Sequence, residues 1–233
     1  MSGRVRPAAR VAIIDYGLGN LFSVQQACLT VGLDAVITRD WTELAICDAL
    51  ILPGVGAFGD AMETLHRLDL VGPIRDCAAS GKRLVGICLG IQLLMSESCE
   101  FGRHEGLGLI PGKVVPFPCP REGGRPLKVP QVGWNRIHPA GGGAGRWVGT
   151  PLEGLSDGDY MYFVHSFIAV PENPSVILST THYGDVEFCS SLFCGNIFAC
   201  QFHPERSGRK GPVVYENLRS SLQAARSGER SPQ

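Results

Sequence analysis

Several sequence patterns that would indicate a particular class of function are missing from this 233-residue chain. The formal net charge is −1. No basic block is longer than Arg209-Lys210, which argues against a nucleic-acid-binding surface. The apolar runs are too short to cross a bilayer. The Arg-rich residues 1–10 lack the apolar core of a signal peptide, because Asp15 interrupts the run at 11–14. We therefore expect a cytoplasmic protein.

The sequence also contains no Cys-x-x-Cys pair, although it has nine cysteines. The nearest spacings, at Cys189, Cys194 and Cys200, are wider than a zinc site usually needs and lie where alternating strands are expected. Reduced thiols that mostly fill the core are the better interpretation. The sequence also has no P-loop and no dinucleotide-binding fingerprint, so we predict neither a cofactor nor a metal.

The first half of the chain alternates buried strands with helices. Apolar runs predict strands at 11–15, 35–38, 49–52 and 83–87, and helical spacing predicts helices from Asn20, over 58–68 and over 73–79. This order predicts an α/β fold with a mainly parallel sheet and helices on both faces. In the second half, short runs between turn residues predict added antiparallel strands, and a helix over 213–224 ends the fold. These strands are expected at 114–118, 134–138, 160–164, 176–181, 188–192 and 197–202.

Length and composition predict one domain. A chain of this size can bury a large core, and its content of 44% hydrophobic and 18% charged residues fits a globular protein. We predict that the domain covers 11–225, with a disordered extension at 1–10 and a disordered tail at 226–233.

One cysteine, Cys88, differs from the others in its surroundings. It lies in the sequence GICLG (86–90), where a buried strand meets a turn flanked by glycines and an amphipathic stretch over 91–95 follows. Strand, tight turn and helix is the order of the elbow that exposes a nucleophile in α/β hydrolases. Gly86 and Gly90 leave room for a strained backbone and close packing, and a helix N-terminus favours a thiolate. The alternative is that Cys88, like most free cysteines, is a small core residue.

A base for this nucleophile is available in the sequence QFHPE (201–205). His203 can take a proton from Cys88, and Glu205, two residues further on, can hold the imidazole in the correct tautomer if the segment is extended. The tripeptide HPE is a weak signal by itself, because it arises by chance in loops. Together the two motifs predict a catalytic triad of Cys88, His203 and Glu205.

Separate motifs in register resemble the class I, triad-type glutamine amidotransferases. The general resemblance rests on PGVGAFGD (53–60), GICLGIQ (86–92) and QFHPE (201–205). Further motifs, DYGLGNL (15–21), GWN (133–135) and FVHS (163–166), narrow it to the glutaminase subunits of imidazole glycerol phosphate synthase, in histidine biosynthesis. The resemblance covers about 11–222. It implies the flavodoxin-like amidotransferase fold and hydrolysis of glutamine to glutamate and ammonia.

The expected reaction needs donors for an oxyanion and a pocket for glutamine. The backbone N–H of Leu89, directly after the nucleophile, is one oxyanion donor on geometric grounds. The resemblance implies Val55 as the second, and the glycines on both sides let its peptide turn. Gln92, one turn after Cys88, is either a substrate ligand or an ordinary surface glutamine. The resemblance favours the first and implies this substrate-binding set: Gly56, Gln92, Ser166 and Phe167.

An amidotransferase delivers ammonia directly to a synthase, because free ammonia is mostly protonated near neutral pH. The resemblance implies a heterodimer with a cyclase subunit, a (β/α)8 barrel that makes imidazole glycerol phosphate and an aminoimidazole carboxamide ribonucleotide. The loop 16–20 and the segment 130–135 are predicted to face this partner. Trp134 is either an interface anchor or a core residue. Family members usually carry histidine at the position of Gln131, so details of the contact there stay open.

Other functions compete with this interpretation. The glutaminases of anthranilate and aminodeoxychorismate synthases typically have Gly-Pro-Gly where this chain has Gly54-Val55-Gly56, and γ-glutamyl hydrolases are further enzymes of the same broad type. A regulatory subunit that has lost catalysis is disfavoured by the intact triad. A metal-binding or redox protein is disfavoured because the ligand spacing is absent.

Overall fold

An eight-stranded mixed sheet forms the centre of the computed structural model, which describes residues 8–227 apart from the side chains of 142 and 144. The strand order is β11-β14-β15-β16-β4-β3-β1-β2. The strands from β16 to β2 pair in parallel, and β11, β14 and β15 extend the sheet in antiparallel fashion. The strands are β1 (Arg10–Ile14), β2 (Asp34–Thr38), β3 (Ala49–Gly54), β4 (Arg83–Cys88), β11 (His138–Pro139), β14 (Ile177–Tyr183), β15 (Val186–Cys194) and β16 (Ile197–Cys200).

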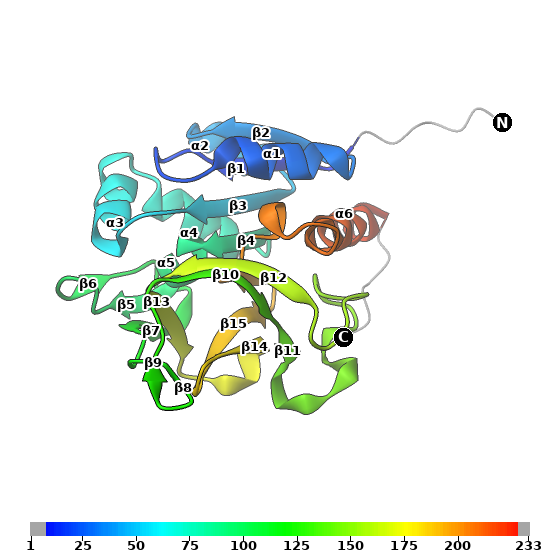
Figure 1. Ribbon diagram of the computed structural model, residues 1–233. Helices are drawn as coiled ribbons and strands as arrows, with labels where there is room; N and C mark the ends of the chain where they lie inside the picture. Colours follow the sequence, from blue (N-terminus) through cyan, green and yellow to red (C-terminus); the bar gives the residue numbers. More distant parts are fainter. Residues whose placement is uncertain (1–7, 228–233) are drawn as a thin grey trace.

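Helices cover both faces of this sheet (Figure 1). Strand β1 shows why: Val11 and Ile13 belong to one buried cluster, and Ala12 and Ile14, which point the other way, belong to a second. The first cluster includes side chains of α1 (Leu21–Thr30) and α6 (Gly211–Ser227). The second includes side chains of α2 (Trp41–Ile46), α3 (Phe58–Arg67) and α4 (Val71–Ala79). The predicted α/β architecture is confirmed.

The chain also forms smaller sheets, which lie beside the antiparallel strands of the main sheet (Figure 1). A four-stranded sheet has the order β13-β7-β5-β6, and two strand pairs, β10 with β12 and β8 with β9, are antiparallel. These strands are β5 (Met95–Ser98), β6 (His104–Glu105), β7 (Ile110–Pro116), β8 (Arg121–Glu122), β9 (Arg125–Pro126), β10 (Gln131–Arg136), β12 (Tyr160–His165) and β13 (Phe167–Pro171). The predicted antiparallel additions are confirmed, although several of them lie outside the main sheet.

Some local predictions differ from the structure. The amphipathic stretch at 91–95 is not one helix: α5 (Leu89–Leu93) ends early, and Met95 pairs with Ile110 in β5 and β7. Helix α2 was not predicted; Asp40 caps it by accepting from the Thr42 N–H at 2.8 Å. The glycine-rich stretch 141–145 falls in two short 3₁₀ turns, Ala140–Gly142 and Ala144–Trp147.

The predicted disordered ends are described only in part. Residues 1–7 and 228–233 lie outside the described residues. Within the described part, β1 starts at Arg10 and α6 continues to Ser227, so ordered elements extend slightly beyond 11–225 at both ends. Between residues 8 and 227, the structure contains no helix long and apolar enough to cross a membrane.

Candidate active site

The carboxyl ends of three neighbouring strands bring the predicted residues together. Gly54 at the end of β3 pairs with Cys88 at the end of β4, so the loop that contains Val55 starts beside the cysteine. On the other side of β4, Cys200 at the end of β16 pairs with Ile87, and the chain then leads directly to His203. Open α/β sheets bind ligands at this edge.

The backbone at Cys88 has the strand–turn–helix order that the sequence predicts. Its φ is +56° and its ψ is −108°, a strained conformation for a residue with a Cβ atom, and α5 starts at the next residue. A Cβ atom on Gly90 would lie 2.0 Å from the carbonyl oxygen of Leu52, and one on Gly86 would lie 3.0 Å from the backbone of Gly90. Both glycines are therefore required by close packing around the turn.

The His203 and Glu205 side chains form a buried pair. They are 7% and 1% exposed, and the His203 Nδ1–H donates to Glu205 Oε1 at 2.7 Å. Burial lowers the pKa of His203, but the neighbouring Cys88 and Glu205 outweigh this effect and raise the pKa to about 10. The bond at Nδ1 leaves Nε2 free; it is buried and has no hydrogen-bond partner among the described residues. A charged His203 is a suitable counterion for a Cys88 thiolate.

Gln201, which is not among the predicted site residues, connects Cys88 to Gln92. Its Nε2 donates to Cys88 Sγ at 3.7 Å, and its Oε1 accepts from Gln92 Nε2 at 3.0 Å. Gln92 Nε2 also donates to the Phe167 carbonyl at 3.2 Å. Gln92 is buried, so the surface-glutamine alternative is wrong. Because its amide nitrogen is engaged, its Oε1 is the atom left for a ligand, and an acceptor suits an ammonium group better than a carboxylate.

A cavity of about 250 Å³ opens beside Cys88. It gathers both predicted oxyanion donors and the whole predicted substrate-binding set, while His203 and Glu205 are buried outside its lining. Its size suits a ligand as small as an amino acid. The lining residues are Val55, Gly56, Cys88, Leu89, Gln92, Glu100, Pro130, Val164, His165, Ser166 and Phe167.

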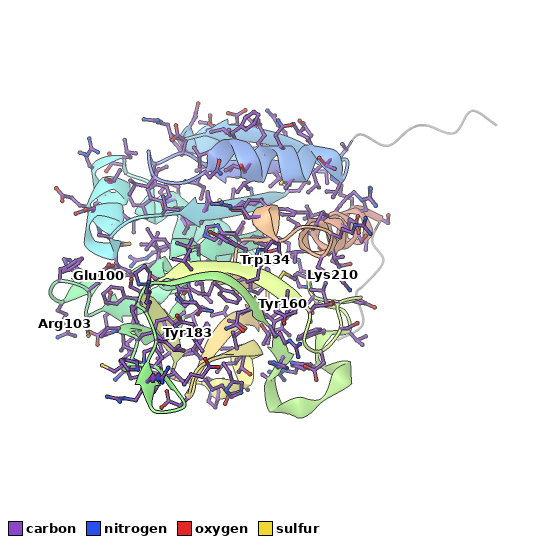
Figure 2. All side chains as sticks on the ribbon, in the orientation of Figure 1. Glu100, Arg103, Trp134, Tyr160, Tyr183 and Lys210 are labelled. Carbon is purple, nitrogen blue, oxygen red and sulfur yellow. The ribbon has the colours of Figure 1, made fainter. Side chains whose placement is uncertain are left out.

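Glu100 places a carboxylate in this lining. It follows β5 and lies close to α3 (Figure 2), where its Oε2 accepts from the Phe58 N–H at 2.7 Å. Ala57 makes no side-chain cap, so Glu100 caps the first turn of α3. It is the one acidic side chain among the lining residues and so the natural site for a ligand's ammonium group. No local pattern identifies it, because its role depends on a contact with a distant helix.

His165 lines the cavity, and Gln131 contacts His165 without lining the cavity itself. The His165 Nδ1–H donates to the Phe167 carbonyl at 2.9 Å. Burial lowers the pKa of His165 to about 4, so the ring is neutral. Gln131 is buried, with its Oε1 3.2 Å from the His165 Nε2. The departure at Gln131 therefore concerns the contact with His165, since the side chain does not reach the surface.

The two segments predicted to face a partner each contain exposed and buried residues. Trp134 is 53% exposed and stacks edge-on against Tyr162 at 6.0 Å, so the core alternative for Trp134 is wrong. The Arg206 guanidinium lies 4.7 Å from the centre of the same Tyr162 ring. In the loop 16–20, Tyr16 is buried and donates to the Pro53 carbonyl at 2.7 Å. Tyr16 thus supports the loop beside Cys88, whereas Gly17 and Asn20 are exposed.

Comparisons with known proteins agree with this geometry. The family model for class I glutamine amidotransferases matches residues 12–218. The chain belongs to this family. It is 44% identical over 214 residues to the imidazole glycerol phosphate synthase subunit HisH of Aquifex aeolicus, covering 90% of this chain and 96% of that protein. It is 46% identical over 201 residues to the HisH subunit of Rhodopirellula baltica, covering 86% of this chain and 92% of that protein.

Solved structures share the fold of this amidotransferase at low sequence identity. A putative GMP synthase protein from Thermoplasma acidophilum superposes with a TM-score of 0.68 at 17% identity, covering 96% of this chain and 98% of that one. PurLQS from Thermotoga maritima gives a TM-score of 0.70 at 19% identity, with 92% and 99% covered. These structures support the amidotransferase fold alone.

Proposed function

We propose that this chain is the glutaminase subunit of an imidazole glycerol phosphate synthase. It hydrolyses glutamine to glutamate and ammonia, and the ammonia is used in histidine biosynthesis. The observation that carries the proposal is the edge of the sheet at Cys88. There a strained cysteine lies in register with Gly54, next to the buried pair of His203 and Glu205. Relatives named as HisH subunits, at 44–46% identity over most of the chain, support the choice of synthase.

The reaction proceeds through a thioester. The Cys88 thiolate attacks the side-chain amide carbon of glutamine, and the C–N bond breaks as His203 gives a proton to the leaving ammonia. His203 then takes a proton from water, whose oxygen attacks the thioester and releases glutamate and the thiolate. Glu205 holds the Nδ1–H of His203 so that its Nε2 faces the reacting atoms.

Two backbone N–H groups stabilise the oxyanion in both steps. Leu89 contributes the first, since it follows the nucleophile and opens α5. Val55 contributes the second from the neighbouring strand end. Each such donor is worth roughly 3–4 kcal/mol of transition-state stabilisation. Gly56, with a φ of +107°, gives the Val55 loop a backbone shape that residues with a Cβ atom rarely adopt.

Glutamine is held by its α-carbon groups. The Glu100 carboxylate and Gln92 Oε1 bind the α-ammonium group, and the backbone of Gly56, Ser166 and Phe167 completes the pocket around the rest of the substrate. This arrangement leaves the side-chain amide to extend towards Cys88.

The partner is a cyclase subunit with a (β/α)8 barrel, which takes the ammonia and forms imidazole glycerol phosphate and an aminoimidazole carboxamide ribonucleotide. Its contact surface includes Trp134, whose exposed ring is supported by Tyr162. We place the complex in the cytoplasm, where a nucleophilic thiol stays reduced.

Glutamate release tests the proposal. The purified chain is assayed by itself, and then together with a cyclase subunit plus its ribonucleotide ligand. We expect low activity for the chain by itself and a sharp rise in the full complex. High activity of the chain by itself that the cyclase does not change would leave the triad in place but assign the chain to another synthase or to a free hydrolase.

Variants of the triad test the assignment of residues. Cys88→Ser and His203→Ala are expected to remove nearly all glutaminase activity, and Glu205→Gln to leave a measurable remnant, because Glu205 orients the base without exchanging protons. Cys119→Ser, at an exposed free thiol, is the matched control and keeps full activity. An active Cys88→Ala enzyme contradicts the mechanism.

A further inference from the structure

Tyr215 is a buried tyrosine that the mechanism above does not use. It lies on α6, is 1% exposed, and is among the largest fully buried side chains of the protein. Its hydroxyl group is shielded from solvent and has no hydrogen-bond partner among the described residues. Burying a hydroxyl without a partner is costly, so a phenylalanine would fill this space more favourably. We therefore expect a hydrogen-bond partner for this hydroxyl group close by.

Glu205 has an oxygen in the same situation. Its Oε1 accepts from His203, but its Oε2 is buried and has no hydrogen-bond partner within the described part of the chain. A carboxylate that orients a catalytic base is expected to have both oxygens held, because one bond leaves it free to rotate.

The two groups lie on elements that pack against each other. Helix α6 begins at Gly211 and packs against the 3₁₀ turn Pro204–Arg206, which contains Glu205. The contact is close: a Cβ atom on Gly211 would overlap the Pro204 carbonyl oxygen. Tyr215 is one helical turn after Gly211 and therefore on the same face of α6. This face of α6 packs against the turn that contains Glu205.

The electrostatics agree with this placement. Burial and, after it, the negative charge of Glu205 raise the pKa of Tyr215, so the phenol keeps its proton and can donate. The other titratable groups that act on Tyr215 are the Cys28 and Cys200 thiols. Burial raises the pKa of both, to about 12 for Cys28, so both are neutral near pH 7. Among the described residues that act on it, Glu205 is thus the charged acceptor.

We propose that Tyr215 is a positioning residue of the triad, whose hydroxyl donates to Glu205 Oε2 directly after a small side-chain rotation or through one bridging water. Glu205 is then held from two sides, by His203 and by Tyr215, and the imidazole keeps the orientation that the attack on glutamine requires. This inference rests on the proposed function.

The test is Tyr215→Phe, as a single substitution and combined with Glu205→Gln, assayed with the cyclase subunit plus its ligand. We expect Tyr215→Phe to lower kcat about tenfold, as for one hydrogen bond to a charged group, and to leave KM for glutamine unchanged. In the Glu205→Gln background, the same substitution is expected to have no further effect on kcat. Tyr183→Phe is the matched control and is expected to leave kcat unchanged, because that hydroxyl makes an exposed hydrogen bond to the Lys128 carbonyl.

Three results would overturn the inference: an unchanged kcat, an equal loss of kcat in both backgrounds, or a rise in KM without a change in kcat. If Tyr215→Phe does not fold, a fluorotyrosine at 215 keeps the packing and alters the donor, and an unchanged kcat then counts against the inference. Cys88→Ala is measured alongside. Activity in Cys88→Ala refutes the proposed function itself, whereas an inactive Cys88→Ala with a fully active Tyr215→Phe refutes only the role of Tyr215.

Discussion

Acidification is expected to weaken the fold through one histidine, His165. Burial lowers its pKa from 6.5 to about 4, aided by the charge on His203 and opposed by the hydrogen bond to the Phe167 carbonyl. Between these values the unfolded chain binds a proton at His165 and the native protein does not. Stability therefore rises with pH in this window, is complete above pH 6.5, and is lost progressively as the pH falls from 6.5 to about 4. Since one pKa unit corresponds to about 1.4 kcal/mol, the loss amounts to about 3 kcal/mol.

Urea unfolding at pH values from about 7 down to about 4 measures this loss. Carboxyl groups titrate in the same range, so the informative quantity is the difference between the wild-type protein and His165→Asn, whose amide can still donate to the Phe167 carbonyl. We expect the free energy of unfolding of His165→Asn to fall less on acidification, by about 3 kcal/mol. His182→Asn, at an exposed position, is expected to follow the wild type. Parallel pH curves for the wild type and His165→Asn would refute the argument that His165 is buried and neutral.

Two further substitutions test the pocket and the elbow. Glu100→Gln is expected to raise KM for glutamine by about tenfold to a hundredfold with a smaller change in kcat, since it removes a charge partner of the α-ammonium group. Initial-rate kinetics would measure this, with Glu97→Gln, whose partner is Arg103, as the control; an unchanged KM would place the ammonium group elsewhere. Gly90→Ala is expected to destabilise the fold by at least about 3 kcal/mol, because its Cβ would overlap a backbone carbonyl of β3. Gly72→Ala in α4, where a Cβ meets open space, is expected to be neutral or stabilising by up to about 1 kcal/mol, and equal effects of the two in urea unfolding would contradict the packing argument.

Local patterns made the elbow and the pair of His203 and Glu205 predictable. The elbow is contiguous in the chain, so an apolar run, two glycines and a cysteine contain most of its information. His203 and Glu205 are two residues apart, and their 2.7 Å contact needs only the backbone shape of that short segment. The order of strands and helices in the first half was readable for the same reason, because hydrophobic periodicity reports which side of each element is buried.

The residues that surround and support the candidate site could not be predicted from local patterns. Glu100 joins the cavity through the first turn of α3, and Gln201 contacts Cys88 from the segment directly after β16. Tyr215 lies on the last helix, which packs against the turn that contains Glu205. Such contacts depend on how elements pack, and a single buried side chain leaves no periodic trace in the sequence. The early end of α5 has the same origin, since Met95 is drawn into pairing with Ile110 in β7.

The sequence by itself thus predicted the chemistry that we propose: a nucleophile, a base and an orienting carboxylate in motifs whose parts are neighbours along the chain. Only the tertiary structure decided which strand ends lie side by side, and therefore that Gly54 and Cys88 meet at one edge of the sheet. It also decided that Gln131 faces His165 and that Trp134 is exposed. The physical reason is that local conformation follows from nearby residues, whereas burial and hydrogen bonding between distant segments are settled only when the whole core packs.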